Sequence, residues 1–280
     1  MSVEHYENFP VASWLCPPAL RPPITAIYWF ARRADDLADE GDAPAAQRLA
    51  DLADYRAELR KATRGEAPDP RWAGVFSPLA QQIRAHALPV DLLDDLLQAF
   101  IRDVPNPRYA DRPALLDYCR QSANPVGRLL LHLHGIGDRD ALAQSDAICS
   151  ALQLINFWQD LSVDLPRGRC YLTDEDLARH GIDTDRLPAT DTPATQALVA
   201  ELCAWARAMM LSGAPLVHRL PGRAGWELRA VVQGGLRILE KIAAMQHCSL
   251  TRRPTLGPAD LALMTWRSLW MRRQTASAQP

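Results

Sequence analysis

The chain contains 280 residues, with 31 Lys or Arg and 33 Asp or Glu, and its formal net charge at pH 7 is −2. This balance argues against a nucleic-acid-binding protein, because such proteins usually carry a clear basic excess. Hydrophobic residues make up 48% of the chain and charged residues 23%, which excludes disordered and fibrous classes and predicts a sizeable buried core.

No targeting or membrane-spanning segment is expected. The N-terminal sequence lacks the basic stretch and apolar run of a signal peptide. The most apolar window, residues 197–217, is interrupted by Glu201, Arg207 and a Gly-Ala-Pro turn, which argues against a bilayer span. The six cysteines form no C-x-x-C pair and predict reduced thiols in a cytoplasmic protein. Peripheral association with a membrane surface stays open.

Proline marks the boundaries of the predicted elements. Because proline interrupts helix interiors, the long segments without it predict helices and the proline-rich stretches between them predict turns. Apolar residues in these segments recur at spacings of three and four. We therefore expect an all-α protein of eight to ten elements, with a single domain over residues 1–273 and a flexible tail over 274–280. The predicted helical segments are 24–43, 45–67, 90–104, 126–165, 194–214, 222–253 and 259–279.

The first predicted helix ends in a cluster of acidic residues. At about 100° per residue, one face carries Tyr28, Arg32, Asp35 and Asp39. Asp36 and Glu40 lie one step round the helix and are expected to point more toward solvent. On this segment alone, an exposed acidic helix end and a binding site are equally acceptable interpretations.

A proline at position 125 interrupts the segment YCRQSANPVGRLLL. It should open a helical turn and free a carbonyl near Gln121, while Gly127 lets another group approach closely. Two interpretations stay open: the break lines a pocket and helps to place a water molecule, or it serves helix packing only.

A second acidic stretch lies in the segment AICSALQLINFWQDLSVDLPRGRCYL, at the end of the helix predicted over 126–165. Its polar stripe contains Gln153, Asn156, Asp160 and Asp164, and apolar residues fill the remaining directions. A helix that is apolar almost all round should be buried. Buried carboxylates cost several kcal/mol unless they are paired with a cation, so this stripe predicts either a metal site or an internal salt bridge to arginine.

Together the two helices favour divalent cations and a phosphorylated ligand. Carboxylate and amide oxygens are typical Mg²⁺ ligands, and Mg²⁺ ions can be shared with a diphosphate. Arg32 lies beside the first acidic pair, and Arg167 and Arg169 follow the second. The forked donors of arginine suit phosphate oxygens.

These residues carry a resemblance to a known family. DDLAD and QLINFWQDLSVDLPRGRCYL resemble the two aspartate-rich motifs of the squalene/phytoene synthase family, and ENFPVASWLCP and YCRQSANPVGRLLL stand at two further family segments. The resemblance spans Asn8 to about Arg267. It implies the isoprenoid synthase fold, which is all-α and has a central apolar cavity.

The resemblance also implies roles for individual residues. Two or three Mg²⁺ ions would be bound by Asp35, Asp39, Asn156, Asp160 and Asp164. The four aspartates and Tyr171 would be catalytic. Substrate would be bound by Phe9, Tyr28, Arg32, Ala123, Gly127, Gln153, Asn156 and Arg169.

Departures from the family pattern bear on the reaction. Asn8-Phe9 replaces the usual Ser-Phe, and Asn124-Pro125 replaces Gly-Thr. These features resemble the hydroxysqualene synthase branch, in the bacterial hopanoid pathway. That branch implies a Mg²⁺-dependent lyase that converts presqualene diphosphate and water to hydroxysqualene and diphosphate, with no NADPH expected. A head-to-head prenyltransferase is the alternative, and a non-catalytic relative is disfavoured because every motif aspartate is present.

The resemblance also implies which molecules the protein binds. The partner is a prenyl diphosphate substrate, and no nucleic acid is expected. The hand-off of product to other hopanoid-pathway enzymes and peripheral contact with the inner face of the membrane stay open.

Overall fold

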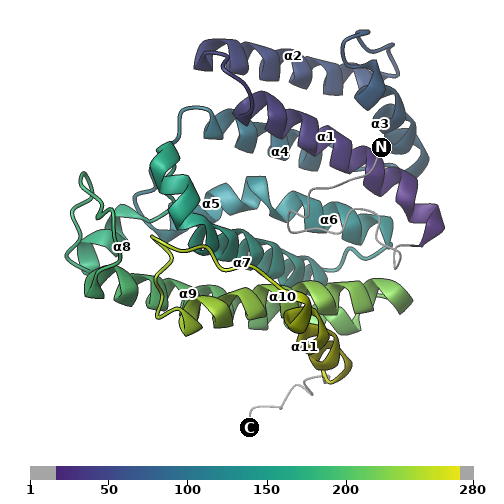
Figure 1. Ribbon diagram of the computed structural model, residues 1–280. Coiled ribbons are helices and arrows are strands. Elements are labelled where there is room, and N and C mark those ends of the chain that lie inside the picture. Colours follow the sequence, from purple (N-terminus) through teal and green to yellow (C-terminus); the bar gives the residue numbers. More distant parts are fainter. Residues whose placement is uncertain (1–16, 272–280) are drawn as a thin grey trace.

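The structure, a computed structural model, describes residues 17–271. Within this range it contains eleven α-helices, three short 3₁₀ helices and no strand (Figure 1). In chain order these are η1 (Pro18–Leu20), α1 (Arg21–Asp39), α2 (Ala45–Arg64), α3 (Ala73–His86), α4 (Val90–Asp103), α5 (Arg112–Ser122), α6 (Asn124–Leu133), α7 (Arg139–Asp164), η2 (Leu165–Arg167), α8 (Asp174–Arg179), α9 (Pro193–Gly213), η3 (Ala214–His218), α10 (Gly222–Ala244) and α11 (Pro258–Leu269).

The all-α prediction is confirmed, but the predicted count of eight to ten elements is too low. The expected helix over 126–165 is two helices, because the chain turns at Gly135, whose φ of 69° suits glycine. Helix α3 was missed because it contains Pro78 in its interior. The predicted tail at 274–280 lies outside the described residues.

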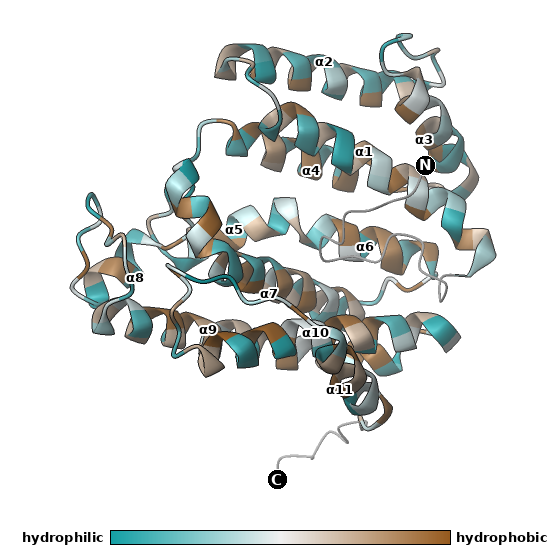
Figure 2. Cartoon of the chain, viewed as in Figure 1, coloured by the Kyte–Doolittle hydropathy of each residue, from teal (hydrophilic) through white to brown (hydrophobic). Residues whose placement is uncertain are grey.

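The helices form two hydrophobic cores. In the first, α1 to α4 pack the rings of Phe30, Tyr55 and Phe76 against one another, with centroids 4.7 to 5.9 Å apart. The second is built on α5, α7, α9 and α10 (Figures 1 and 2). Since α4 packs on α1, α5 and α6, it connects the two cores.

Helix α7 is the centre of the second core. It packs against α5, α6, α9 and α10, and Leu154, Trp158 and Leu161 are at most 1% exposed. The prediction that this helix is buried nearly all round is therefore confirmed. Its close approach to α9 depends on Gly213, where a Cβ would lie 2.5 Å from the Gln144 carbonyl oxygen.

One helix of the described residues, Pro193–His218, is long and apolar enough to cross a membrane by length and composition. It comprises α9 and η3, and it buries Leu198, Leu202 and Met210 against the second core. Its hydropathy therefore matches its position beside α7.

Candidate active site

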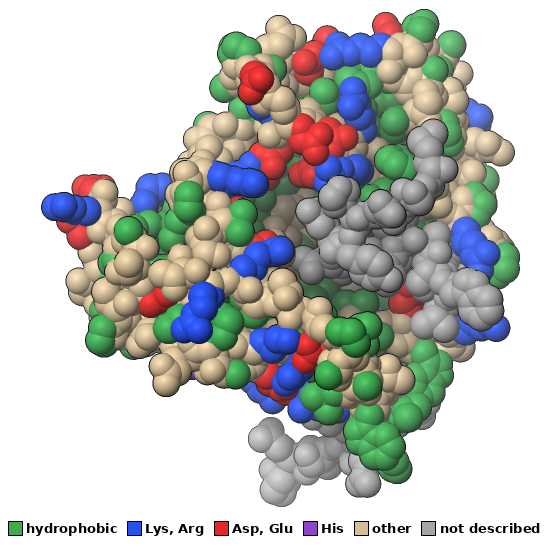
Figure 3. Space-filling model, viewed as in Figure 1, with side chains coloured by type: hydrophobic (Ala, Val, Ile, Leu, Met, Phe, Trp, Pro, Cys, Tyr) green, Lys and Arg blue, Asp and Glu red, His purple; other side chains and the backbone are tan. Residues whose placement is uncertain are grey.

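The two acidic helix ends are joined by an ion pair. Asp39, at the last position of α1, pairs with Arg169, which follows η2 at the end of α7. The backbone N–H of Arg169 donates to the Asp164 carbonyl at 3.0 Å, so the loop that carries Arg169 is tied to the end of α7. Figure 3 shows acidic side chains gathered over α1, bordered by basic ones, beside a hollow in this face. The structure thus brings together two motifs that are distant in the sequence, at residues 35–39 and 153–172.

Arg32 is the basic partner of the first acidic cluster. Its guanidinium lies 3.3 Å from Asp35, 2.9 Å from Asp36 and 2.8 Å from Glu40. The Asp36 side chain is 22% exposed, against 42% for Asp35. The expectation that Asp36 points more toward solvent is therefore wrong, because Arg32, four residues earlier, holds its carboxylate against the helix. Glu40, with a side chain 63% exposed, does face solvent.

Asp160, in the second cluster, is held by an arginine from a distant segment. Arg253 donates through Nε to Oδ1 at 2.5 Å and through Nη2 to Oδ2 at 3.2 Å. The Gln159 amide donates to the Pro254 carbonyl at 2.8 Å, which fixes the segment after α10 across α7 (Figure 1). No local pattern connects Arg253 with Asp160, since 93 residues separate them.

Asp164 has no such partner. No side-chain hydrogen bond or ion pair to its carboxylate occurs among residues 17–271. Burial raises its pKa to about 6, and the nearby Asp160 carboxylate adds to the increase, while Arg167 and Arg253 oppose it. A partly buried carboxylate beside a second one is a favourable place for a cation.

The donors fit magnesium in kind, but the side chains are not assembled as a coordination shell. In the part of the chain that is described, no three His, Cys, Asp or Glu side chains converge to hold a metal ion. Arginines engage Asp35, Asp39 and Asp160. Metal binding by these aspartates therefore requires the arginines to move away. Asn156 and Gln153 are half-buried on α7, on the same stripe.

Tyr171 belongs to a buried aromatic group. Its ring stacks on Phe157, with centroids 3.7 Å apart and planes 7° apart. Tyr109 and Tyr118 each lie 6.1 Å from it. Trp158, the next residue along α7, is fully buried and belongs to the second core.

Asp103 is a candidate that sequence reasoning missed. It ends α4 and accepts a 2.7 Å hydrogen bond from the Tyr118 hydroxyl. Burial raises its pKa to about 7, the Tyr118 hydrogen bond opposes this, and Asp35 raises it further. A small cavity is lined by Asp103, Asn106, Pro107, Arg169, Cys170 and Tyr171. Asp103 thus lies between the first acidic cluster and Tyr171, although no motif marks it.

The break at Pro125 occurs where it was predicted. Ala123 separates α5 from α6 and is half-buried. A Cβ on Gly127 would collide with Ser145 and with Cys149 Sγ, the latter at 2.6 Å, so this glycine packs α6 against α7. Of the two interpretations of this break, lining a pocket or packing helices, the structure favours packing for Gly127.

Two other predicted substrate-binding residues lie elsewhere. Tyr28 is half-buried on α1, and Phe9 lies outside the described residues.

Comparison with known proteins assigns the family. Residues 3–260 match the squalene/phytoene synthase family. The chain belongs to this family. The hydroxysqualene synthase of Sinorhizobium fredii is 34% identical over 92% of this chain and 86% of that protein. The hydroxysqualene synthase of Zymomonas mobilis is 46% identical, over 56% of this chain and about half (51%) of that protein.

The solved structures agree with the family assignment. The crystal structure of squalene synthase HpnC from Alicyclobacillus acidocaldarius superposes with a TM-score of 0.79 at 36% identity, and covers 87% of this chain and 90% of that one. The protein therefore has the isoprenoid synthase fold, as predicted. It is a squalene/phytoene synthase family enzyme, in a family that processes prenyl diphosphates and is typically metal-dependent. The roles assigned to individual site residues stay predictions.

Proposed function

We propose that this squalene/phytoene synthase family member is a cytoplasmic hydroxysqualene synthase. It converts presqualene diphosphate and water to hydroxysqualene and diphosphate. The observation that carries the proposal is the ion pair between Asp39 and Arg169, which unites both aspartate-rich motifs at one site. The similarity to two hydroxysqualene synthases supports this choice within the family.

The aspartates and Asn156 supply the oxygen donors of the proposed metal site. Asp35 and Asp39 contribute from α1, and Asn156, Asp160 and Asp164 contribute from α7. Mg²⁺ bound there would neutralise charge that develops on the departing diphosphate. The Asp164 carboxylate supports the fit, because no side chain among residues 17–271 pairs with it and burial, with the Asp160 carboxylate nearby, raises its pKa despite Arg167 and Arg253.

Arginines act on the diphosphate in the proposed reaction. Arg169 leaves Asp39, Arg32 leaves Asp35, and both donate to phosphate oxygens, which are better anionic partners for a forked guanidinium. The same exchange frees the carboxylates for the cation. The site therefore changes from internal ion pairs to a shared network around the substrate.

Bond cleavage and hydration follow. The C–O bond of presqualene diphosphate breaks, and its electron pair leaves with the diphosphate. The reaction requires that bulk water be kept away from the resulting carbocation. The Tyr171 ring lies near Asp103 and Asp164, and a ring face stabilises a cation. One water adds its oxygen to the cation and loses a proton, which gives hydroxysqualene without any hydride donor.

Product analysis tests the proposal. Purified protein is incubated with presqualene diphosphate and Mg²⁺, with and without NADPH, and hydroxysqualene is expected in both. Squalene formed only with NADPH would overturn the proposal in favour of a squalene synthase. Product formation from farnesyl diphosphate alone would favour the head-to-head prenyltransferase.

A matched pair of variants tests the site. Asp160→Ala should abolish Mg²⁺-dependent turnover, because it removes a central carboxylate of the second motif. Asp54→Ala replaces an exposed aspartate on α2 and should leave turnover unchanged. Unchanged turnover in Asp160→Ala would refute the site assignment.

A further inference from the structure

The exposed face of α11 is apolar and carries no charge. It is formed by six exposed residues, of which five lie on the helix and Trp270 directly follows it: Leu261, Ala262, Thr265, Trp266, Leu269 and Trp270. Four of these are large hydrophobic residues with 54 to 59% of their surface exposed. At 100° per residue the six positions fall on one half of the helix. We call this surface the α11 face.

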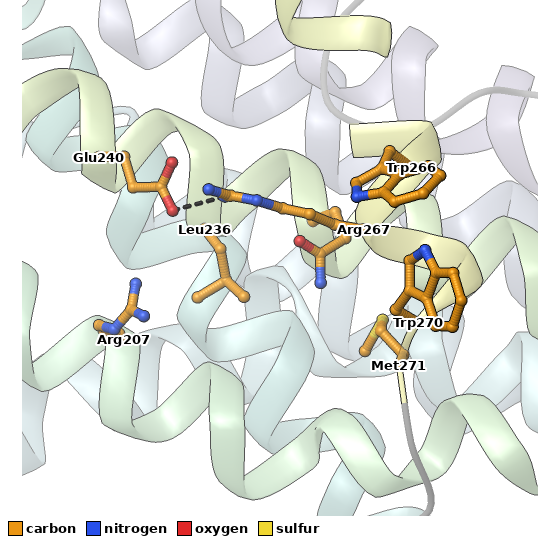
Figure 4. A pocket seen from close by; sticks show the side chains of 8 residues that line it. Arg207, Leu236, Glu240, Trp266, Arg267, Trp270 and Met271 are labelled. Atoms are coloured by element: carbon orange, nitrogen blue, oxygen red, sulfur yellow. Dashed lines mark hydrogen bonds and ion pairs between the residues drawn. The ribbon is translucent and has the colours of Figure 1, made fainter. Parts of the chain in front are cut away.

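Two indole rings dominate the α11 face. Trp266 and Trp270 lie side by side, with ring centroids 5.5 Å apart. They border a surface groove of about 630 Å³ between α9, α10 and α11, as Figure 4 shows. Single exposed hydrophobic residues are common on protein surfaces, but a contiguous patch with two tryptophans marks an interaction site. In Figure 3 hydrophobic side chains gather on this end of the molecule.

Basic residues border the α11 face. Arg267 spans the groove to Glu240 at 2.6 Å, and Arg207 lines its far side (Figure 4). Arg229 donates to the Ser268 carbonyl at 3.3 Å, and its guanidinium lies 4.5 Å from the ring of Trp226, which is itself 43% exposed. The apolar face thus has a cationic border.

The near-zero net charge of the chain conceals an uneven distribution of basic and acidic residues along the sequence. Residues 222–280 contain nine Lys or Arg and three Asp or Glu, a formal charge of +6. The preceding 221 residues contain 22 and 30, a formal charge of −8. The part of the sequence that carries the α11 face is therefore its basic part, and it attracts anionic surfaces.

We propose that the α11 face docks the protein on an anionic lipid surface. Tryptophan is favoured at the boundary between headgroups and acyl chains, because its ring is apolar and its N–H is polar. Arginines beside an apolar helix face add attraction to anionic lipids. A second copy of the chain is a poorer occupant, since pairing two such faces would bring two segments of charge +6 together. The proposal does not rest on the proposed function.

Vesicle sedimentation tests the proposal without substrate. The protein should bind vesicles of phosphatidylglycerol mixed with phosphatidylcholine, and bind pure phosphatidylcholine far less. Added salt should weaken the binding, because it screens the arginines. The double variant Trp266→Ala/Trp270→Ala should bind at least about tenfold more weakly, because it loses most of the inserted apolar area. Arg207→Ala should bind about fivefold more weakly.

A control variant and a check of folding accompany the vesicle-binding test. Trp29→Ala removes a tryptophan that is 42% exposed on α1, a helix that packs in the first core and not beside α11, and should leave vesicle binding unchanged. Circular dichroism should show all variants folded, since the replaced side chains are exposed. Absent binding by the unmodified protein, or equal binding by the double variant, would overturn the proposal. Sedimentation that shows a dimer which the double variant loses, without vesicle binding, would assign the face to a second copy instead.

Discussion

Replacing Asp103 with asparagine should stabilise the protein in a pH-dependent way. The carboxylate is partly buried and its pKa is raised from an ordinary 3.8 to about 7, chiefly by burial. Between these values the native state binds a proton that the unfolded state has lost, so the free energy of unfolding of the unmodified protein falls as pH rises. Above pH 7 the group is ionised in both states and the loss is complete.

The magnitude follows from the two pKa values. Their difference corresponds to about 4 kcal/mol, which is an upper figure because solvent reaches part of the side chain. Asparagine stays neutral and can still accept the hydrogen bond from Tyr118. The stability of Asp103→Asn relative to the unmodified protein should therefore rise by about 2 to 3 kcal/mol between pH 5 and pH 8.

Urea unfolding followed by tryptophan fluorescence, without Mg²⁺, measures this difference at several pH values. Asp117→Asn is the matched control, because hydrogen bonds from Arg120 and Arg102 lower the pKa of this exposed carboxyl. Asp117 is thus ionised throughout the range, and its variant should show no trend. A pH-independent difference for Asp103→Asn would refute the reasoning that burial holds this carboxyl protonated.

Three further predictions concern packing and metal binding. Asp176→Ala should lower the free energy of unfolding by about 3 to 5 kcal/mol, because a fully buried carboxylate that pairs with Arg112 at 2.9 Å is lost; a urea midpoint near the original would contradict this. Gly127→Ala should lower stability by about 2 kcal/mol, whereas Gly74→Ala, which meets nothing within 4 Å, should raise it slightly in the same urea assay. Mg²⁺ affinity, measured by calorimetry, should fall as pH drops through about 6, because Asp164 then takes up a proton that competes with the metal. Equal Mg²⁺ affinities at pH 5 and pH 8 would argue against Asp164 as a metal ligand.

Helical periodicity predicted much of α7, because polar and apolar residues recur along this segment at helical spacing. Asn156, Asp160 and Asp164 lie on one narrow stripe, and burial of the other directions shows in the apolar residues themselves. Proline spacing likewise located most helix boundaries. The turn between α6 and α7 was not predicted, since it depends on the positive φ of Gly135 and not on proline.

The features that were missed depend on contacts between distant segments. Burial raises the pKa of Asp103, Tyr118 of α5 opposes this rise and Asp35 of α1 adds to it, and no local pattern in the sequence reports these contacts. Arg253 reaches Asp160 only because the segment after α10 folds back over α7. Asp36 was misplaced because a helical wheel gives directions and cannot tell which carboxylate an arginine selects.

The ion pairs that close the acidic site have a thermodynamic consequence for ligand binding. Arg169 on Asp39 and Arg253 on Asp160 compete with a metal ion for the same carboxylates. A diphosphate that draws these arginines away lowers the cost of metal binding, and a metal that displaces them leaves the guanidiniums available for phosphate. Coupling between two ligands is reciprocal, so the factor by which diphosphate tightens Mg²⁺ must equal the factor by which Mg²⁺ tightens diphosphate. The aspartate-rich motifs therefore favour joint occupancy by both ligands over occupancy by either one alone.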